Sequence, residues 1–417
     1  MRWYYGWNVL AVGVAFQAVL FGFTVNSFTL WATEWVKEFD APRGDIMIGV
    51  TIWTIVQGLM APFAGKAMDR SSIRLLVTAG SVATVLGLAA ISQLDAVWQI
   101  LVVYCTLIAF GTLLAGPLAA QTLAAKWFRG RRGFAVGIST IGTSIGGFLM
   151  PPLVTMLFLD VGWRDAHLIL AGIALVTIIP VVWLVVRNDP EEMGIEPDPE
   201  TEVSAARSAS RVFPEWTTWT ILKERNFWIM IVAFVPMVTA LASIQHNLSP
   251  LASDSGIEPQ EASYLVSLML GSAAVSKLFF GLVTDRWDLR TLFWMANVSI
   301  GLAICLFLAD PGYALMLLAS ALLGLGAGGF LPLLAALVST RFGPRSFGRV
   351  MGLVGPFTLI AGFGPWAAGW LRDNLGTYEL ALQMSLAILL PAVAVMVLLR
   401  PLAAVAQSNL AGGRPAA

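Results

Sequence analysis

Charge, cysteine and histidine are all scarce in this chain. Charged residues make up 12% of its 417 residues, and it has 2 Cys and 2 His. Cys105 and Cys305 lie in different apolar runs, so they form neither a metal-binding spacing nor an evident disulfide pair. His167 and His246 lie in different halves, without a Ser/Cys-His-Asp order or a ligand cluster around them. The sequence therefore predicts that the protein is not an enzyme and has neither a metal site nor a cofactor.

A nucleotide-binding motif is missing as well, although one glycine-rich stretch superficially resembles one. Gly324, Gly326, Gly328 and Gly329 are closely spaced, but no strand precedes them and no soluble domain surrounds them. We interpret this stretch as a place of close helix packing or a hinge. No phosphate-binding loop occurs elsewhere, which argues against an ATP-driven pump. The formal net charge of zero gives no sign of a nucleic-acid partner.

Apolar residues dominate what remains. The chain is 58% hydrophobic, and its long apolar runs approach or exceed the roughly 20 residues needed to span a bilayer core. Gly and Pro interrupt these runs without the alternation typical of barrel strands, so helices are expected. The runs lie near residues 5–31, 46–64, 75–93, 97–122, 133–158, 166–186, 226–250, 262–282, 291–309, 313–338, 350–371 and 380–400. The sequence thus predicts an all-α protein with twelve transmembrane helices in a lipid bilayer.

The basic residues predict the orientation of these helices. Of the 25 Lys and Arg residues, 20 fall on the side of the N terminus, one is Lys277 within a span, and the other four are Lys37, Arg43, Arg164 and Arg372. Loops rich in Lys and Arg face the cytoplasm in multi-pass proteins. We therefore expect both termini in the cytoplasm, with the chain in a bacterial inner membrane.

One polar segment divides the helices into six and six. Residues 188–225 are rich in Pro, acids and small side chains, which cannot bury enough surface to offset the entropy of ordering. We predict a six-helix bundle over residues 1–187, a cytoplasmic linker over 188–225 and a second bundle over 226–417.

The two halves share motifs at nearly constant spacing. Gly65, Asp69, Arg70 and Arg74 recur in the second half, with the same internal spacing, as Gly281, Asp285, Arg286 and Arg290. Gly133, Gly137, Gly147 and Pro117 recur at almost the same offset as Gly348, Gly352, Gly362 and Pro332. Internal duplication of six helices is typical of transporters whose substrate binds between two bundles.

With these repeats, the chain resembles the major facilitator superfamily over essentially its whole length. The loop from Gly65 to Arg74 is similar to that superfamily's loop between its second and third helices. An Asp at a helix end can pair with nearby Arg residues and helix termini, forming a latch that breaks when the bundles rock. The predicted gate residues are Asp69, Arg70, Arg74, Asp285, Arg286 and Arg290. The alternative is that these charges only set the topology.

Finer motifs resemble the monocarboxylate and oxalate/formate branch of the superfamily. They are Tyr4-Tyr5-Gly6-Trp7, the run from Lys126 to Gly137, Gly162-Trp163-Arg164 and the run from Pro190 to Gly194. In that branch the eighth helix carries an arginine that holds the substrate carboxylate, and Lys277 occupies its position here. The resemblance implies that Lys277 binds an anion, although lysine lacks the planar fork of arginine.

Lys277 also stands out without the resemblance, because it lies deep inside an apolar helical run. A cation in hydrocarbon costs a few kcal/mol and is retained where it meets a bundle interior, a water path or an anion. The alternative is a lysine that reaches to the membrane surface. Ala273 replaces the acid common in the branch one turn earlier. Any proton coupling would therefore involve Lys277, His246 or the substrate itself. The remaining alternative is plain exchange without a coupled proton.

Other polar residues within the predicted spans are candidate substrate ligands. They are His246, Gln245, Asn247, Asn26, Thr143 and Thr358, with helix capping or packing as the alternative. Thr143 and Thr358 are related by the spacing of the repeat and are expected to face each other across the cavity, while Phe16, Phe21 and Phe330 shape its walls. We predict a monomeric secondary or exchange transporter of a small organic monoanion, expected to be a monocarboxylate. The alternatives are an efflux carrier for an amphipathic or zwitterionic compound and a non-transporting membrane receptor.

Overall fold

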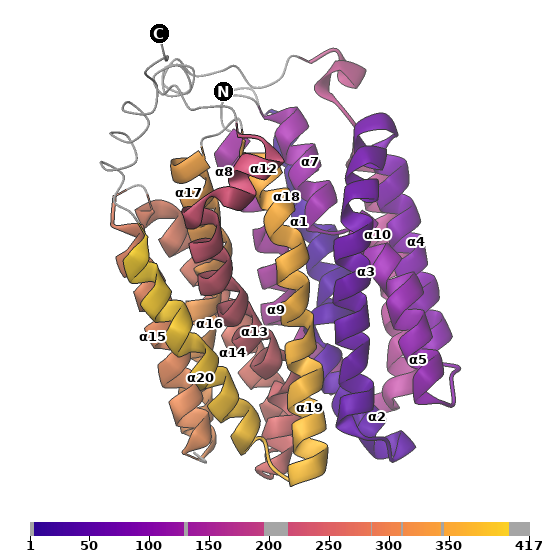
Figure 1. Ribbon diagram of the computed structural model, residues 1–417. Helices are drawn as coiled ribbons and strands as arrows, with labels where there is room; N and C mark the ends of the chain where they lie inside the picture. The colour runs from indigo at the N-terminus through magenta and orange to yellow at the C-terminus, as the bar shows by residue number, and fades with distance from the viewer. Residues whose placement is uncertain are drawn as a thin grey trace.

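The structure, a computed structural model, describes residues 4–128, 132–195, 216–284, 286–309, 312–342 and 346–399. Every regular element in these ranges is helical, and twelve helical segments are long and apolar enough to cross a membrane. They stand side by side as one elongated bundle of helices (Figure 1). The prediction of an all-α membrane protein with twelve spans is confirmed.

The first six spans contain two π-helical turns. The first span comprises α1 (Gly6–Phe21), the π-helical η1 (Gly22–Asn26) and α2 (Phe28–Phe39). The second and third are α3 (Arg43–Arg70) and α4 (Ile73–Ile91). The fourth comprises α5 (Val97–Val103), the π-helical η2 (Tyr104–Ile108), α6 (Ala109–Leu114) and α7 (Pro117–Trp127). The fifth combines α8 (Arg132–Ser139) with α9 (Ile141–Val161), and the sixth is α10 (Trp163–Val185).

The second six spans follow two short helices, η3 (Pro190–Met193) and α12 (Thr218–Lys223). Three unbroken spans come next, α13 (Arg225–Asp254), α14 (Pro259–Val283) and α15 (Leu289–Leu308). The tenth span combines α16 (Tyr313–Gly328) and α17 (Phe330–Phe342). The eleventh comprises α18 (Phe347–Thr358), η4 (Leu359–Gly362) and α19 (Phe363–Leu375), and the twelfth α20 (Glu379–Val395) with η5 (Met396–Leu398).

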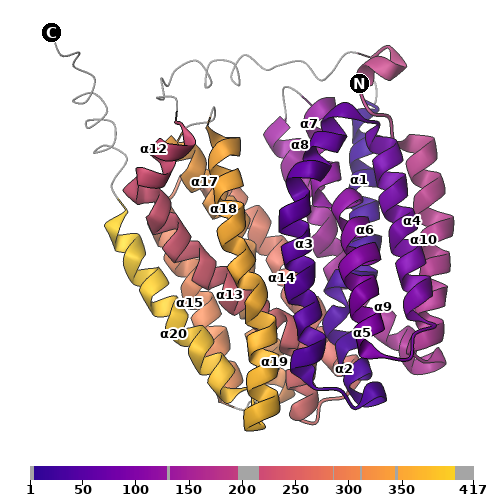
Figure 2. The same ribbon diagram turned by 45° about the vertical axis from the view of Figure 1, so that its right-hand side comes forward.

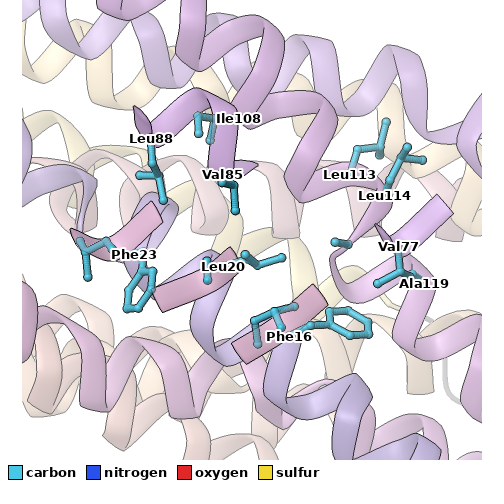
Figure 3. Close-up of a cluster of buried hydrophobic side chains, with 14 of the residues drawn as sticks. Phe16, Leu20, Phe23, Val77, Val85, Leu88, Ile108, Leu113, Leu114 and Ala119 are labelled. Atoms are coloured by element: carbon cyan, nitrogen blue, oxygen red, sulfur yellow. The ribbon is translucent and has the colours of Figure 1, made fainter. Parts of the chain in front are cut away.

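Two separate clusters of buried hydrophobic side chains hold the spans together. One draws its members from Val9 to Val186 and the other from Ile221 to Leu399. Figure 3 shows part of the first cluster, in which Phe16 lies near Val77 and Ala119 of neighbouring helices. The predicted boundaries of the bundles and linker stay a prediction, and residues 196–215 of that linker lie outside the described residues.

The glycine-rich stretch of the tenth span packs tightly against neighbouring helices. A methyl group at Gly324 would overlap the backbone oxygen of Met269 on α14, and one at Gly326 would lie 2.7 Å from the backbone oxygen of Ala296 on α15. The backbone turns at Gly329, between α16 and α17. Small residues let helix backbones approach closely in membranes, and this stretch brings α16 onto both α14 and α15.

The two groups of spans meet along two pairs of helices, α3 with α19 and α9 with α14. We call the end that holds Arg43 and Asp254 the closed end, because α2 and α13 also pack together there. The other end, which holds Arg70 and Arg286, is the basic end. Figure 2 shows α3 and α18 diverging toward the basic end.

Four glycines of the repeated motifs support this description of the basic end. They lie on the helices that border the junction: Gly65 on α3, Gly137 on α8, Gly281 on α14 and Gly352 on α18. A methyl group built on any of them would meet no atom within 4 Å. The described residues therefore form a molecule whose halves join at the closed end and separate toward the basic end.

The substitution Gly324→Ala is expected to destabilise the second half. Its methyl group would push α16 away from the α14 backbone, and such overpacking typically costs about 1–3 kcal/mol. The melting temperature of the purified protein in detergent should fall. Gly172→Ala on α10, where a methyl group meets no atom within 4 Å, is the matched control and should not lower it. Equal melting temperatures for both variants would contradict the packing role of Gly324.

Candidate functional site

A cavity of about 350 Å³ lies at the junction of the two halves. Its walls are contributed by α3 from the first half and by α13, α17, α18, η4 and α19 from the second. Most of the lining is apolar, and three side chains add polar groups: Thr54, His246 and Thr358. The other lining residues are Val50, Val238, Ala242, Phe330, Leu331, Leu334, Met351, Val354, Gly355, Ala361, Gly362 and Pro365.

His246 lies where this cavity meets the first half. Its Nδ1 lies 3.0 Å from the Ala242 carbonyl oxygen, one turn back on α13. Its ring also borders a second, smaller pocket with Phe28 and Tyr104, and the centroid of the Phe28 ring is 6.5 Å away. The imidazole therefore contacts both halves. Its Nδ1 faces the Ala242 carbonyl, and its Nε2 takes no part in that interaction.

Lys277 lies on α14, on the second line of contact between the halves. Its ammonium donates a hydrogen bond to Ser144 Oγ on α9, at 2.7 Å. Within the described part of the chain, no carboxylate lies within ion-pair distance of this ammonium, and Ala273 stands one turn earlier. An ammonium has three donors, so two are left for other partners. Lys277 thus reaches across the junction to α9, and it lies outside the lining of the 350 Å³ cavity.

The other candidate ligands divide between the cavity and the packing around it. Thr358 lines the cavity, with its hydroxyl donating to the Gly355 carbonyl at 2.7 Å. Thr143 does not line it, so the expected pairing of these two residues across the cavity is not seen. The Thr143 carbonyl instead accepts a hydrogen bond of 2.9 Å from the side chain of Asn26, within the first half.

The neighbours of His246 on α13 face other surroundings. Asn247 is buried, and its amide donates to the Ser243 carbonyl at 2.9 Å and to the Pro365 carbonyl at 3.1 Å. The Tyr378 hydroxyl donates to the side-chain oxygen of Asn247 at 3.2 Å. These bonds use Asn247 to hold α13 and α19 together. Gln245 is half-buried and lies outside the cavity lining. Of the candidate aromatic walls, Phe330 lines the cavity, whereas Phe16 is in the core of the first half.

The predicted gate residues at the basic end do not form a latch among the described residues. Arg70 and Arg286 are exposed. Arg74 lies over the Trp183 ring, 4.9 Å from its centroid. Arg290 pairs with Asp288 at 3.2 Å, just before α15, and this hydrogen bond lowers the pKa of the Asp288 carboxyl. The Asp69 side chain and Asp285 lie outside the described residues.

An ion-pair cluster at the closed end was missed by the sequence reasoning. The Asp254 carboxylate, at the end of α13, accepts two hydrogen bonds from Arg43 on α3, at 2.6 and 2.7 Å. It also accepts two from Arg372 on α19, at 2.6 and 3.2 Å. We call Arg43, Asp254 and Arg372 the closed-end cluster. Because Arg43 belongs to the first half and the other two to the second, the cluster ties the halves together.

Further polar contacts surround the closed-end cluster. The backbone N–H of Gly44 donates to Asp373 at 2.7 Å, and the hydroxyls of Thr33 and Ser249 lie 3.0 Å apart across the junction. The Arg43 guanidinium lies 5.7 Å from the centroid of the Tyr378 ring, and burial raises the pKa of the Tyr378 phenol. Arg43 and Arg372 are two of the four basic residues predicted on the side opposite the N terminus, and that scarcity was the available sequence signal.

The profile of the Major Facilitator Superfamily matches residues 14–250 and 238–416 of the chain. The chain belongs to the Major Facilitator Superfamily. Membership of this superfamily accounts for the twelve apolar spans.

Several curated relatives of this superfamily member are similar to it at low identity. Monocarboxylate transporter 12 of Rattus norvegicus is 25% identical over 63% of the chain, and the chain covers 58% of that protein. The chain thus spans about three fifths of the length of the relatives that it matches in this group. Human monocarboxylate transporter 2 is 23% identical over 90% of the chain and 81% of its own length. The agnestins efflux protein AgnL12 of Paecilomyces divaricatus is 26% identical over 90% of the chain and 83% of its own length.

Solved structures of the superfamily confirm the fold. A bacterial homologue of the human lysosomal transporter Spinster, in an inward-facing and unoccupied conformation, superposes with a TM-score of 0.69. The two sequences are 15% identical, and the match covers 97% of this chain and 96% of the other. The same homologue in an occupied conformation gives a TM-score of 0.64.

The substitution Asp254→Asn is expected to loosen the closed end of this superfamily member, because it removes the charge that both arginines bind. The test places a single cysteine by Ser249→Cys, in a background without Cys105 and Cys305. Ser249 is only 2% exposed. Its labelling by a membrane-impermeant maleimide should become about tenfold faster, as a shift of roughly 1.4 kcal/mol would give.

The matched control for this test is Asp160→Asn. It removes an exposed carboxylate from the last turn of α9, which lies at the closed end but outside the closed-end cluster. It should leave the labelling rate unchanged. A rate that is also unchanged in Asp254→Asn would show that the closed-end cluster does not hold the halves together.

Proposed function

We propose that the protein is a secondary or exchange transporter that moves a small organic monoanion, a monocarboxylate, by alternating access. The observation that carries the proposal is the ammonium of Lys277. It lies within a membrane span at the junction of the halves, and its hydrogen-bond partner is the neutral hydroxyl of Ser144.

Electrostatics favours an anion as the partner of this ammonium. A charged side chain within a span is unfavourable unless it is paired or reaches water. Ser144 supplies one hydrogen bond without any negative charge, so an anion that approaches Lys277 gains a charge-assisted bond. Within the described spans, no second cation lies at comparable depth. A monoanion therefore neutralises the site better than a dianion such as oxalate.

The cavity supports a substrate that has an apolar part. Its volume of about 350 Å³ falls in the range of small-molecule sites, roughly 300–1,000 Å³. Apolar side chains such as Phe330, Leu334 and Met351 form most of its wall, while His246 and Thr358 add hydrogen-bonding groups. We propose that the carboxylate binds toward Lys277 and the apolar body of the substrate occupies this cavity.

The asymmetry of the junction supports alternating access. The closed-end cluster joins the halves on one side, and the basic end is open among the described residues. In the proposed cycle the closed-end cluster breaks as the gate residues of the basic end, Asp69, Arg70, Arg74, Asp285, Arg286 and Arg290, come together. The proposal places both termini in the cytoplasm of a bacterium and treats the monomer as the working unit, with no enzymatic step.

Efflux of an amphipathic compound is the second candidate function. The apolar wall of the cavity favours it, and so does the likeness to the agnestins efflux protein over 90% of the chain. A neutral amphipathic ligand would not need the charge of Lys277. Binding that survives Lys277→Ala would therefore favour this second candidate.

Lys277→Ala is expected to weaken anion binding. Thermal shifts with formate, acetate, lactate, pyruvate and benzoate would identify ligands, and counterflow in proteoliposomes would measure their transport. Loss of a hydrogen bond to a charged group is worth about 1.5–3 kcal/mol, so affinity should fall about 10- to 100-fold. Lys277→Arg, which keeps the charge, should bind these anions more tightly than the alanine variant.

Lys223→Ala, at an exposed lysine of α12, is the matched control and should transport like the parent. Equal thermal shifts in the parent and Lys277→Ala would remove Lys277 from the binding site. Ligand binding without counterflow under any gradient would instead indicate a non-transporting receptor.

Phe330→Ala tests the proposed place of the apolar body. Removing this ring from the cavity wall should weaken benzoate by about tenfold while acetate changes little, because only the larger ligand reaches the ring. The measurement is competition by each acid in the counterflow assay. Phe363→Ala, at an exposed ring on α19, is the control. An equal effect on both acids would place the substrate elsewhere.

A further inference from the structure

The cavity at the junction has three polar side chains in its lining, and they come from three different helices. Thr54 lies on α3 in the first half, whereas His246 lies on α13 and Thr358 on α18 in the second. All three are half-buried, and all border the same space of about 350 Å³. A ligand that fills this cavity therefore meets polar groups of both halves.

The two hydroxyl groups of the lining already use their protons within their own helices. Thr54 Oγ1 donates to the Val50 carbonyl at 2.8 Å, and Thr358 Oγ1 donates to the Gly355 carbonyl at 2.7 Å. A hydroxyl has one proton to donate and two lone pairs that accept. What both threonines have left for a ligand is therefore the capacity to accept a hydrogen bond.

The imidazole of His246 has the same character. Its Nδ1 lies 3.0 Å from the Ala242 carbonyl oxygen, and a carbonyl can only accept, so the proton of the neutral ring is on Nδ1. Nε2 then carries a lone pair and no proton. Among the described residues Nε2 has no hydrogen-bond partner, and it is not one of the fully buried unpaired atoms. It is thus a third acceptor, on a ring that lines the cavity.

The side chains of the lining supply no donor in return. All the others are apolar. The lining residues lie in helices, whose interior N–H groups bond to carbonyls of the same helix. The ammonium of Lys277 lies outside the lining. The cavity therefore presents three acceptors in apolar surroundings, where an acceptor that loses water without gaining a donor is unfavourable.

We propose that the transported monoanion carries a hydroxyl or N–H group on its apolar body, and that Thr54, His246 and Thr358 select this group. The inference rests on the proposed function, in which the carboxylate binds toward Lys277. Because Lys277 is not part of the lining, the donor group is remote from the acid. A site built to bond such a group rejects the analogue that lacks it, since its own polar groups would stay unpaired. A phenolic acid has the required single charge, apolar body and remote donor.

The experiment compares acids that differ in one group. 4-Hydroxybenzoate and 4-methylbenzoate are nearly equal in size, but only the first can donate a hydrogen bond. 4-Methoxybenzoate can accept one but cannot donate. The 3-substituted isomers of these acids test a second position of the donor on the ring. Thermal shifts of the purified full chain measure the affinities, and one of the hydroxy acids should bind about tenfold more tightly than its methyl and methoxy counterparts.

Three substitutions each remove one acceptor with little change in side-chain size: Thr54→Val, Thr358→Val and His246→Phe. Loss of the acceptor that holds the hydroxyl should bring the affinity ratio of the hydroxy and methyl acids to about one, because the methyl acid makes no bond to that acceptor. A purely structural role would change both affinities and keep their ratio. Thr239→Val on α13 is the matched control. Its hydroxyl also donates within its own helix, to the Val235 carbonyl at 2.8 Å, but it lies outside the lining, so the parent's ratio should persist.

The inference is overturned if the methyl and methoxy acids bind the parent as tightly as the hydroxy acids do. It is equally overturned if all three acceptor variants keep the parent's preference. Lys277→Ala separates these failures from a failure of the proposed function. Acids that show no preference for the hydroxyl but lose affinity in Lys277→Ala would remove the donor requirement alone. If none of the acids binds the parent, or if all bind Lys277→Ala equally well, the proposed function fails and the inference fails with it.

Discussion

A bilayer core offers no hydrogen-bond partner to a peptide group, and every span of this protein answers that constraint within itself or against a neighbouring span. Two of the irregular stretches of backbone lie where other helices cover them. Most of η1 is buried, and the break between α16 and α17 lies where glycines press on α14 and α15. Each half has its own cluster of buried hydrophobic side chains. Among the described residues, hydrogen bonds and ion pairs join the halves both at the closed end and along the α9–α14 contact.

Two charged contacts at this junction differ in their chemistry. At the closed end a carboxylate and two guanidinium groups satisfy one another. At the α9–α14 junction an ammonium meets only a hydroxyl. The carboxylate of the closed-end cluster has two cationic partners, whereas the ammonium of Lys277 has a neutral one. This difference supports the proposal that the first contact sets conformation and the second recognises an anion, whose apolar part would occupy the cavity beside His246.

Hydropathy and duplication predicted the number of helices, because each span must be apolar along its length and each motif recurs at a fixed spacing. The depth of Lys277 was likewise evident from its apolar run. Side-chain partners were not, since they depend on helix rotation and on residues far away in the chain. Arg43 and Asp254 are 211 residues apart in the sequence. Asn247 was predicted to bind substrate because it is polar, but its amide donates a hydrogen bond to the backbone of α19. Which end is open is a property of tertiary contacts that no local pattern encodes.

The helix α13 carries both His246 of the cavity and Asp254 of the closed-end cluster. Eight residues separate them, a distance of about 12 Å along a helix, and both belong to the same helix, with Pro250 between them. Because a proline removes one helical hydrogen bond, this segment can bend at Pro250. A tilt of the whole helix that withdraws the carboxylate from Arg43 would also move the imidazole, whereas a bend at Pro250 would move the carboxylate alone.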